Sequence, residues 1–319
     1  MSRLALLLLL FSAGCGAASP VPGAAGGLWQ DGRIFAAVSG LITQARSRVL
    51  VEMYEFGRGD LAIALVDARA RGADVRVVLD PTVPATLRTG RRLVAGQVAT
   101  RFYPVDDRAQ QIDHVKLLVA DGQALVGGMN WGATSDRNHD YALRLHLPAE
   151  LDRLTAIFDQ DWSLAAGTPR PLAPVGGEIA QTAPGGEIRA LLESALGRAR
   201  YRIEAEVFDL TDPDVVLLLQ SAHRRGARVR VILDPAQDVN RPIFALLSRA
   251  GVEARWYGAP PGAKLHAKAA LTDGLLVLGS ANWSHHGLDV NHELDVATAD
   301  PAAVAAYEAR FETDWEAAA

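Results

Sequence analysis

Residues 114–131 read HVKLLVADGQALVGGMNW, and residues 266–283 repeat the pattern as HAKAALTDGLLVLGSANW. Each copy satisfies H-x-K-x-x-x-x-D followed by G-[GS]-x-N, with the same spacing in both. Alternate residues of a strand point to one face, so the His and the Lys of each copy are expected to project together. The Asp-Gly pair predicts a tight hairpin, and the later glycines let backbone and Asn amide approach an anion closely. The pattern therefore predicts two matching halves around one anion-binding site.

The repeat extends beyond these motifs. Residues 71–81 (RGADVRVVLDP) match residues 225–235 (RGARVRVILDP), and residues 138–145 (NHDYALRL) match residues 291–298 (NHELDVAT). A solenoid would need several short units, whereas here one long unit occurs twice. We therefore predict an internal duplication.

Each copy alternates segments typical of strands and helices. Continuous apolar runs predict strands, and a helical spacing of apolar residues predicts helices. In the first copy the expected elements are strands at 48–56, 75–79, 116–120, 124–126 and around Arg144, and helices at 61–71 and 148–162. This alternation favours an α/β fold of two similar lobes, each a mixed, mainly buried sheet flanked by helices.

Composition divides the chain into five segments. Arg3, the apolar run after it and a small-residue stretch have the pattern of an export signal, and the run is far shorter than the ~20 residues that span a bilayer. The Gly-, Ala- and Pro-rich segments after the signal and between the copies are typical of flexible connections. We predict an export signal at 1–14, a flexible tether at 15–29, lobe 1 at 30–164, a linker at 165–186 and lobe 2 at 187–319.

Cys15 is the only cysteine, so it cannot form a disulfide within the chain. Its position after the small residues resembles the lipobox of bacterial lipoproteins. This resemblance implies export from a bacterial cytoplasm, cleavage before Cys15, acylation of its sulfur and anchoring at a membrane, in the periplasm or at the cell surface. In the alternative, a secreted protein is cleaved near Ala18 and Cys15 is discarded.

The overall charge bears on the partner. The formal net charge is −5, with 49% hydrophobic and 22% charged residues, as in an ordinary globular protein. Residues 1–14 contain one arginine and no acid, so their removal makes the charge −5 − 1 = −6. A protein whose main role is to hold nucleic acid is usually basic. The charge disfavours a nucleic-acid partner, although a local basic cleft can exist on an acidic protein.

Two imidazoles, two ammonium groups and two amides around one site suit a phosphodiester. A neutral imidazole can attack phosphorus while the opposite imidazolium protonates the leaving oxygen, and the Lys and Asn donors can hold the remaining oxygens. Water activated by the second His would then hydrolyse a phosphohistidine. This scheme needs no metal and no cofactor, and the group of His285, His286 and His292 lacks the spacing of a zinc site. The predicted catalytic residues are His114, Lys116, His266 and Lys268, and the predicted phosphate-binding residues are Asn130, Asn282 and Ser280.

The duplicated His-Lys-Asp motif is the defining mark of the phospholipase D superfamily, and the chain resembles this family over residues 30–316. The resemblance implies two α/β lobes with the active site at their interface. It also implies that His114 is the nucleophile and His266 the general acid and base. In the family a downstream acid orients an imidazole across the site, and the matching positions are Glu293 in the second copy and Asp140 in the first.

Two further pairs of residues follow from the motifs. Asp121 and Asp273 precede glycine in the predicted hairpins, where a side chain usually hydrogen-bonds to local backbone. The family resemblance also implies a structural role for them, so we expect these acids to support the motif without contacting substrate. Trp131 and Trp283 follow the two Asn residues and are expected to pack in the core; the alternative is that they line a substrate groove.

Three functions remain open. The first is hydrolysis of phospholipids or phosphatidyl transfer, favoured by the predicted lipid anchor, the acidic charge and the pairing of Gly127-Gly128 with Gly279-Ser280, which resembles lipid-acting relatives. The second is an exported endonuclease that cleaves DNA or RNA, because GSANWS resembles nuclease-type members and Trp side chains can stack on bases. The third is a binding protein without turnover, which two intact motifs disfavour.

Overall fold

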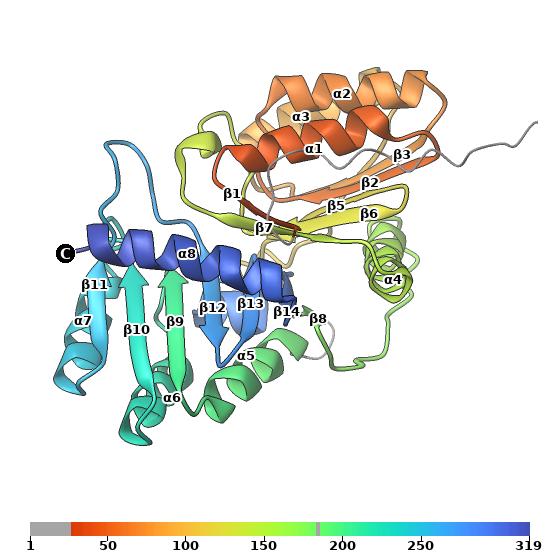
Figure 1. The fold of residues 1–319 in the computed structure, drawn as a ribbon. Helices are drawn as coiled ribbons and strands as arrows, with labels where there is room; N and C mark the ends of the chain where they lie inside the picture. Colours follow the sequence, from red (N-terminus) through yellow and green to blue (C-terminus); the bar gives the residue numbers. More distant parts are fainter. Residues whose placement is uncertain (1–26, 183–185) are drawn as a thin grey trace, which may run out of the picture.

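The computed structural model describes residues 27–182 and 186–319. The predicted export signal at 1–14, Cys15 and all but the end of the predicted tether lie outside these residues. The described chain forms two lobes, and each lobe is built on one sheet (Figure 1).

The first lobe contains a seven-stranded mixed sheet in the order β1-β7-β6-β5-β2-β3-β4. Its strands are β1 (Leu28–Gln30), β2 (Arg48–Met53), β3 (Asp74–Leu79), β4 (Ala99–Phe102), β5 (Lys116–Ala120), β6 (Gln123–Gly127) and β7 (Tyr141–Leu145). Its helices are α1 (Arg33–Gln44), α2 (Gly59–Ala70), α3 (Pro84–Ala95), the short η2 (Ser135–Arg137) and α4 (Pro148–Leu164). β2, β3 and β4 are parallel, and the remaining strands continue the sheet antiparallel.

The second lobe repeats this arrangement in the order β11-β10-β9-β12-β13-β14-β8. Its strands are β8 (Ile179–Gln181), β9 (Arg202–Val207), β10 (Arg228–Leu233), β11 (Glu253–Trp256), β12 (Lys268–Thr272), β13 (Leu275–Gly279) and β14 (Leu294–Thr298). Its helices are α5 (Glu187–Arg198), α6 (Pro213–Arg224), α7 (Asn240–Arg249), the short η3 (His286–Val290) and α8 (Pro301–Ala317).

Local sequence explains the element boundaries. Asp121 and Asp273 adopt φ of 48°, the left-handed conformation that the two tight hairpins of β5-β6 and β12-β13 require. α4 and α8 both begin at a proline, whose fixed φ suits the first turn of a helix and whose missing N–H has no partner there in any case.

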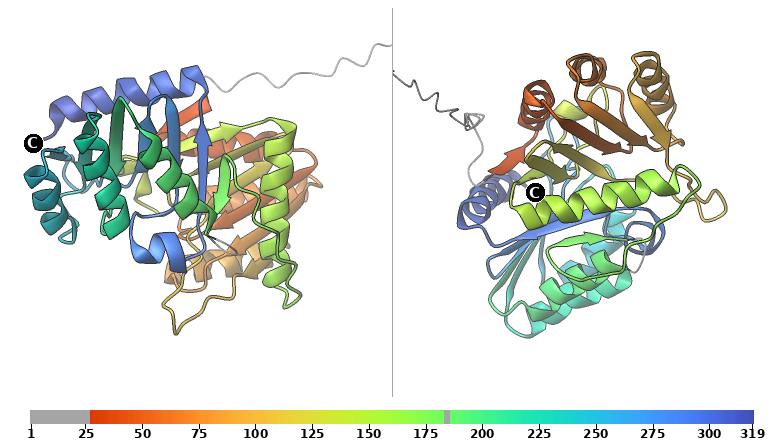
Figure 2. Two further views of the ribbon diagram at one scale, coloured as in Figure 1. Left: turned by 90° about the horizontal axis from the view of Figure 1, so that it is seen from below. Right: turned by 90° about the vertical axis from the view of Figure 1, so that its right-hand side faces the viewer.

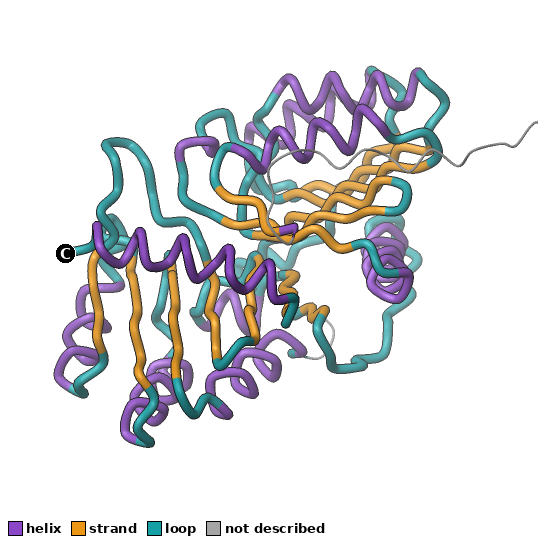
Figure 3. Tube along the Cα trace, in the orientation of Figure 1, coloured by secondary structure: helices purple, strands orange, loops and turns teal. Residues whose placement is uncertain are grey.

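Helices cover both sheets, and two of them lie between the lobes. α1, α2 and α3 pack on the outer face of the first sheet, and α5, α6 and α7 on the outer face of the second, each group over its own apolar core (Figures 2 and 3). α4 contacts β2, β5 and β6 and reaches β8, while α8 contacts β12 and β13 and reaches β1. A third core joins the two lobes; it includes Leu117, Leu143, Phe158, Leu271, Leu294 and Phe311.

Backbone hydrogen bonds also join the lobes. The N–H of His114 donates to the carbonyl of His292 at 2.8 Å, and the N–H of His266 donates to the carbonyl of His139 at 2.8 Å. The segment before β5 therefore runs beside the segment before β14, and the segment before β12 runs beside the segment before β7. Both His-Lys-Asp motifs begin at the interface between the lobes.

The predicted α/β fold of two similar lobes is confirmed. One difference lies in the predicted linker at 165–186, which contains β8 at the edge of the second sheet. Ile179 and Ala180 are buried there, and the surrounding Pro and Gly residues hid this short strand in the sequence. β1 likewise begins at Leu28, inside the predicted tether. Within residues 27–182 and 186–319, no helix has the length and apolarity needed to cross a membrane.

Candidate active site

Each His-Lys pair lies at the start of a central strand. Lys116 is the first residue of β5 and Lys268 is the first residue of β12, with His114 and His266 two positions earlier. Nζ of Lys116 donates to the carbonyl of His114 at 2.6 Å, and Nζ of Lys268 donates to the carbonyl of His266 at 2.5 Å. All four side chains are buried. The equivalent contacts show that the duplication extends to the side-chain geometry.

Each imidazole is paired with a carboxylate from the opposite lobe. Nδ1 of His114 lies 2.8 Å from Oε2 of Glu293, and Nδ1 of His266 lies 2.8 Å from Oδ2 of Asp140. Both carboxylates are buried. With Nδ1 held in this way, Nε2 is the nitrogen of each ring that is not paired with a carboxylate; in His266 it lies 3.2 Å from Nζ of Lys268. The shorter Asp140 reaches its imidazole as closely as Glu293 does.

Electrostatics favour neutral imidazoles in this site. Burial, followed by the charges of Lys116 and Lys268, lowers the pKa of His114 well below its usual value. Burial and the same two lysines lower the pKa of His266 to about 3, against the opposing effect of Asp140. Because each imidazole responds to both lysines, the four groups form one electrostatic unit. A neutral imidazole is the form that can attack phosphorus.

Burial also moves the pKa of both lysines and of Glu293 toward neutrality. Burial lowers the pKa of Lys116 to about 7 and that of Lys268 to about 8. Burial raises the pKa of Glu293 to about 7, although Lys116 acts in the opposite direction. An anionic phosphate beside the lysines would favour their charged form, so the site is suited to an anion.

Aromatic rings border both imidazoles. Tyr54 contacts His114 edge-on with 4.7 Å between ring centroids, and Phe208 contacts His266 at 4.9 Å. The lysine Nζ of each motif lies near the same ring, at 5.2 and 5.0 Å from its centroid. These rings restrict the movement of the four polar side chains.

The predicted phosphate-binding residues occupy two kinds of position. Nδ2 of Asn130 donates to Oε2 of Glu55 at 3.2 Å. Within residues 27–182 and 186–319, the buried Oδ1 atoms of Asn130 and Asn282 have no hydrogen-bond partner. Ser280 is fully buried, and its Oγ accepts the backbone N–H of Leu294 at 2.9 Å. Ser280 thus lies beside the strand that carries the acid partner of His114.

The motif aspartates lie at the hairpins. Asp121 accepts the backbone N–H groups of residues 46–48 at 2.8 to 3.0 Å, and Asp273 accepts those of residues 200–202 at 2.7 to 3.0 Å. Partial burial raises the pKa of each carboxyl, yet these donors lower it overall. Each Asp therefore fixes the start of the neighbouring strand, β2 or β9.

The two tryptophans pack inside the lobes. Trp131 and Trp283 are 3% and 2% exposed, and Trp131 contacts Phe56 with 5.0 Å between ring centroids. The carbonyl of Trp131 accepts the N–H of Gly57 at 2.7 Å, and that of Trp283 accepts the N–H of Thr211 at 2.8 Å. Neither indole is exposed enough here to stack on a base.

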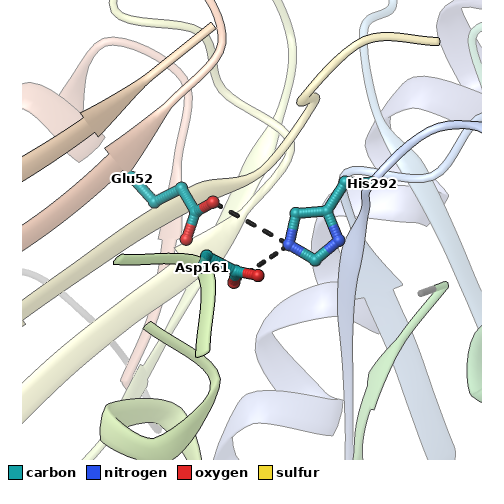
Figure 4. A group of neighbouring side chains, drawn as sticks. All are labelled: Glu52, Asp161 and His292. Carbon is teal, nitrogen blue, oxygen red and sulfur yellow. Dashed lines mark hydrogen bonds and ion pairs between the residues drawn. The ribbon is translucent and has the colours of Figure 1, made fainter. Parts of the chain in front are cut away.

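Two buried acidic clusters beside the site were missed in the sequence analysis. In the first, Nε2 of His292 faces Asp161 and Glu52 (Figure 4). In the second, Nε2 of His139 faces Glu206 and Asp314. Burial would lower the pKa of His292, yet Asp161 and other acids raise it to about 9.

A sequence signal for these clusters existed. Glu52 and Glu206 occupy matching positions of the repeat, in VLVEM and IEAEV, inside strands that are predicted to be mainly buried. Asp161 and Asp314 both stand before tryptophan at matching positions of α4 and α8. A charged residue repeated inside a buried element indicates a conserved internal contact within the duplication.

Two α/β lobes, each contributing a His-Lys pair to one buried site, define the phospholipase D-like class of proteins. The chain belongs to this family: the domain described as "Cardiolipin synthase, PLD-like domain" matches residues 38–162 and again residues 192–315. The predicted family is thereby confirmed.

The relatives with a similar sequence include proteins described as cardiolipin enzymes. The chain is 32% identical over 132 residues to the mitochondrial cardiolipin hydrolase of Homo sapiens, covering 39% of this chain and 52% of that protein. It is 27% identical over 318 residues to the probable cardiolipin synthase YwiE of Bacillus subtilis, covering 86% of this chain and 62% of that protein. The chain thus spans between half and two thirds of the length of these relatives.

Solved structures share the fold. Phosphatidylserine synthase of Haemophilus influenzae superposes with a TM-score of 0.71 over 90% of this chain and 86% of that chain, at 14% identity. Polyphosphate kinase of Porphyromonas gingivalis superposes with a TM-score of 0.64 over 89% of this chain and 46% of that chain, at 16% identity. Since proteins of different description share this fold, the fold alone does not specify the substrate.

Proposed function

We propose that this protein is a phosphodiesterase of the phospholipase D type that acts on phospholipids, by hydrolysis or phosphatidyl transfer, without a metal at the reacting phosphate. The observation that carries the proposal is the crossed pairing of His114 with Glu293 and of His266 with Asp140, with both lysines beside them. This arrangement supplies a neutral nucleophile, a second proton-transferring imidazole and cationic groups for the phosphate oxygens.

The proposed reaction has two steps. Nε2 of His114 attacks phosphorus and the bond to the leaving oxygen breaks. His266 gives that oxygen a proton, because the anionic phosphate beside it raises its low pKa and lets it bind that proton beforehand. Water, or an acceptor alcohol, then gives a proton to His266 and attacks phosphorus, and the bond between phosphorus and His114 breaks. The lysines and the amides of Asn130 and Asn282 would hold the phosphate oxygens during both steps.

A phospholipid substrate is supported by the family and the relatives. The description of the matching domain names cardiolipin synthase. The two relatives above are described as a cardiolipin hydrolase and a probable cardiolipin synthase. The negative net charge of the chain also favours a lipid over a long nucleic acid.

The test is turnover by the protein lacking residues 1–15, in chelator, with phosphatidyl lipids in mixed micelles and single-stranded DNA in parallel. We expect lipid cleavage alone, and its loss in His114→Ala and His266→Ala with unchanged circular dichroism. Alkaline quenching and mass spectrometry of the peptide that contains His114 should show a phosphatidyl adduct. Cleavage of DNA alone would replace the lipid proposal by the endonuclease, and near wild-type activity in either variant would refute the shared site.

We also propose export and membrane association through Cys15, on the sequence pattern of residues 1–15. Incorporation of labelled fatty acid into the full chain, and its loss in Cys15→Ser, would support this. A soluble, unlabelled product cut near Ala18 would refute the anchor and leave a secreted protein.

A further inference from the structure

The two buried acidic clusters are related by the duplication. Each member of one cluster has a counterpart at the matching position of the other copy. The matching pairs are Glu52 on β2 with Glu206 on β9, Asp161 on α4 with Asp314 on α8, and His292 with His139. In both clusters the imidazole comes from one lobe and the two acids come from the other. Each cluster therefore serves as an internal comparison for the other.

The cluster around His139 contains its own compensating groups. Arg310 donates to Asp314 at 2.5 Å and to Asp31 at 2.9 Å. The hydroxyl of Tyr141 donates to Glu206 at 2.5 Å. Asp31 accepts Nδ1 of His139 at 2.6 Å. An arginine and a tyrosine thus supply donors and positive charge to the acids.

The cluster around His292 lacks both of these groups. The position that corresponds to Arg310, one helical turn before the cluster aspartate, is Ile157, and the position that corresponds to Tyr141 is Leu294. Ile157 and Leu294 are fully buried and apolar. The first lobe therefore has the two acids, Glu52 and Asp161, but no arginine at the position that matches Arg310.

The buried carboxylate of Glu52 indicates that the cluster around His292 binds a ligand. Glu52 is 0% exposed, and within the part of the chain that the structure describes neither of its carboxylate oxygens has a hydrogen-bond partner. Oε1 of Glu52 is directed at Nε2 of His292, 3.8 Å away (Figure 4). Oδ2 of the neighbouring Asp113 is also buried without a partner. Burial, with the charges of Asp161 and Asp113, raises the pKa of Glu52 well above its usual value, so its carboxyl needs either a proton or a bound cation.

We propose that Glu52, Asp161 and His292 bind one divalent transition-metal ion, for which Zn²⁺ is the best fit. One imidazole nitrogen and carboxylate oxygens are zinc ligands, and bonds of ~2.0–2.2 Å in tetrahedral geometry place ligand atoms ~3.4 Å apart. Nε2 of His292 lies 3.0 Å from Oδ2 of Asp161 and 3.8 Å from Oε1 of Glu52, and the three ligand atoms lie within 4.8 Å of one another. Small shifts would accommodate the ion.

The position of this site defines its role. His292 is adjacent to Glu293, the acid partner of His114, and its carbonyl accepts the N–H of His114. An ion that joins β2 and α4 of the first lobe to His292 of the second would hold the lobes together beside the active site. The ion is thus a positioning element, and phosphate chemistry takes place elsewhere. A surface pocket lined by Asp161, Gln160 and Tyr103 offers an entry path.

The decisive experiment measures bound metal in the full chain, expressed and purified with added Zn²⁺ and then desalted without chelator. We expect one zinc ion per chain by plasma mass spectrometry in the wild type and in the matched control Glu206→Gln, and less than a tenth of an ion in Glu52→Gln. Removing the ion with chelator should lower the Tm of the wild type and leave that of Glu52→Gln unchanged.

A second variant keeps the proposal testable if Glu52→Gln does not fold. Asp161→Asn keeps the volume of the side chain and replaces a charged ligand by an amide, so it should abolish zinc binding while the chain remains folded. Co²⁺ should give visible absorption bands in the wild type and not in Asp161→Asn. Absence of zinc and cobalt from the folded wild type would overturn the proposal, as would equal metal content in Glu52→Gln and Glu206→Gln, which indicates adventitious binding.

Discussion

Glu293→Gln tests the crossed pairing directly. In the structure, Glu293 is 0% exposed, and its two oxygens lie 2.8 and 3.0 Å from Nδ1 of His114. Nδ2 of Asn291 donates to Oε1 of the same carboxylate at 3.1 Å. Glutamine keeps the shape but replaces one acceptor oxygen by an NH₂ donor. The side chain therefore loses either the 2.8 Å contact of Oε2 with Nδ1 of His114 or the contact of Oε1 with Nδ2 of Asn291.

The size of the effect follows from these contacts. An unpaired buried donor costs ~1–3 kcal/mol, and this is the expected loss in the free energy of unfolding. The effect on rate should be larger, because the carboxylate fixes the tautomer in which Nε2 of His114 is free to attack. Replacing the equivalent acid of a serine protease triad lowers kcat by ~10⁴-fold, and removing the carboxylate partner of a metal-bound imidazole costs ~10–100-fold. We expect a loss of ~10²–10⁴-fold, or ~3–5 kcal/mol of transition-state stabilisation.

The assay is single-turnover hydrolysis of a phosphatidyl substrate with excess enzyme. Chemical denaturation in parallel separates the folding effect from the chemical one. Glu178→Gln, an exposed substitution of the same kind, is the control and should be neutral in both measurements. A Glu293→Gln enzyme that stays within threefold of the wild-type rate would show that the carboxylate does not orient His114, and the proposed mechanism would lose its main support.

Three further outcomes are expected. Because Lys116 and Lys268 have pKa values of about 7 and 8 and must be charged to hold phosphate, kcat/KM should fall as the pH rises through 7 to 8; a flat profile up to pH 9 would contradict this. Asp121→Asn should lower the Tm by a few degrees through its weakened backbone contacts and leave kcat unchanged, and a selective loss of kcat would assign it a catalytic role. Tyr141→Phe removes the hydroxyl that donates to Glu206 across the lobe interface, so it should destabilise the chain by ~1–3 kcal/mol in denaturant titrations, and no change would mean that the contact is not maintained in solution.

Local patterns were sufficient to predict most of the fold. Strands β2, β3, β5 and β6 and helices α2 and α4 lie within a few residues of their predicted ranges, because each is apolar on the appropriate face and is bounded by Gly, Pro or Asp. The strands β1 and β8 were not predicted. Each has three residues in a Gly- and Pro-rich context, and each is a strand only because it pairs with the edge of a sheet formed by distant residues.

The site was predictable only in part. Spacing alone places His114 beside Lys116, since the two lie two residues apart at the start of β5. The crossing of Glu293 to His114 came from the family resemblance, since it depends on how two lobes dock. The cluster of Glu52, Asp161 and His292 joins three distant parts of the chain; the repeat marks its members, but local spacing does not show that they meet.

The crossed contacts explain why the two copies remain in one chain and yet differ. Each lobe supplies the imidazole of one histidine–carboxylate pair and the acid of the other, so a single lobe holds no complete pair. A symmetric dimer of identical lobes would have to use the same acid twice. Fusion of the two copies removes this constraint, and the copies differ at two such positions. Asp140 of the first copy matches Glu293 of the second in the histidine–carboxylate pairs, and Ile157 matches Arg310 in the flanking clusters. The two histidines are therefore paired with different acids, as the proposed division of roles between a nucleophile and a proton-transferring group requires.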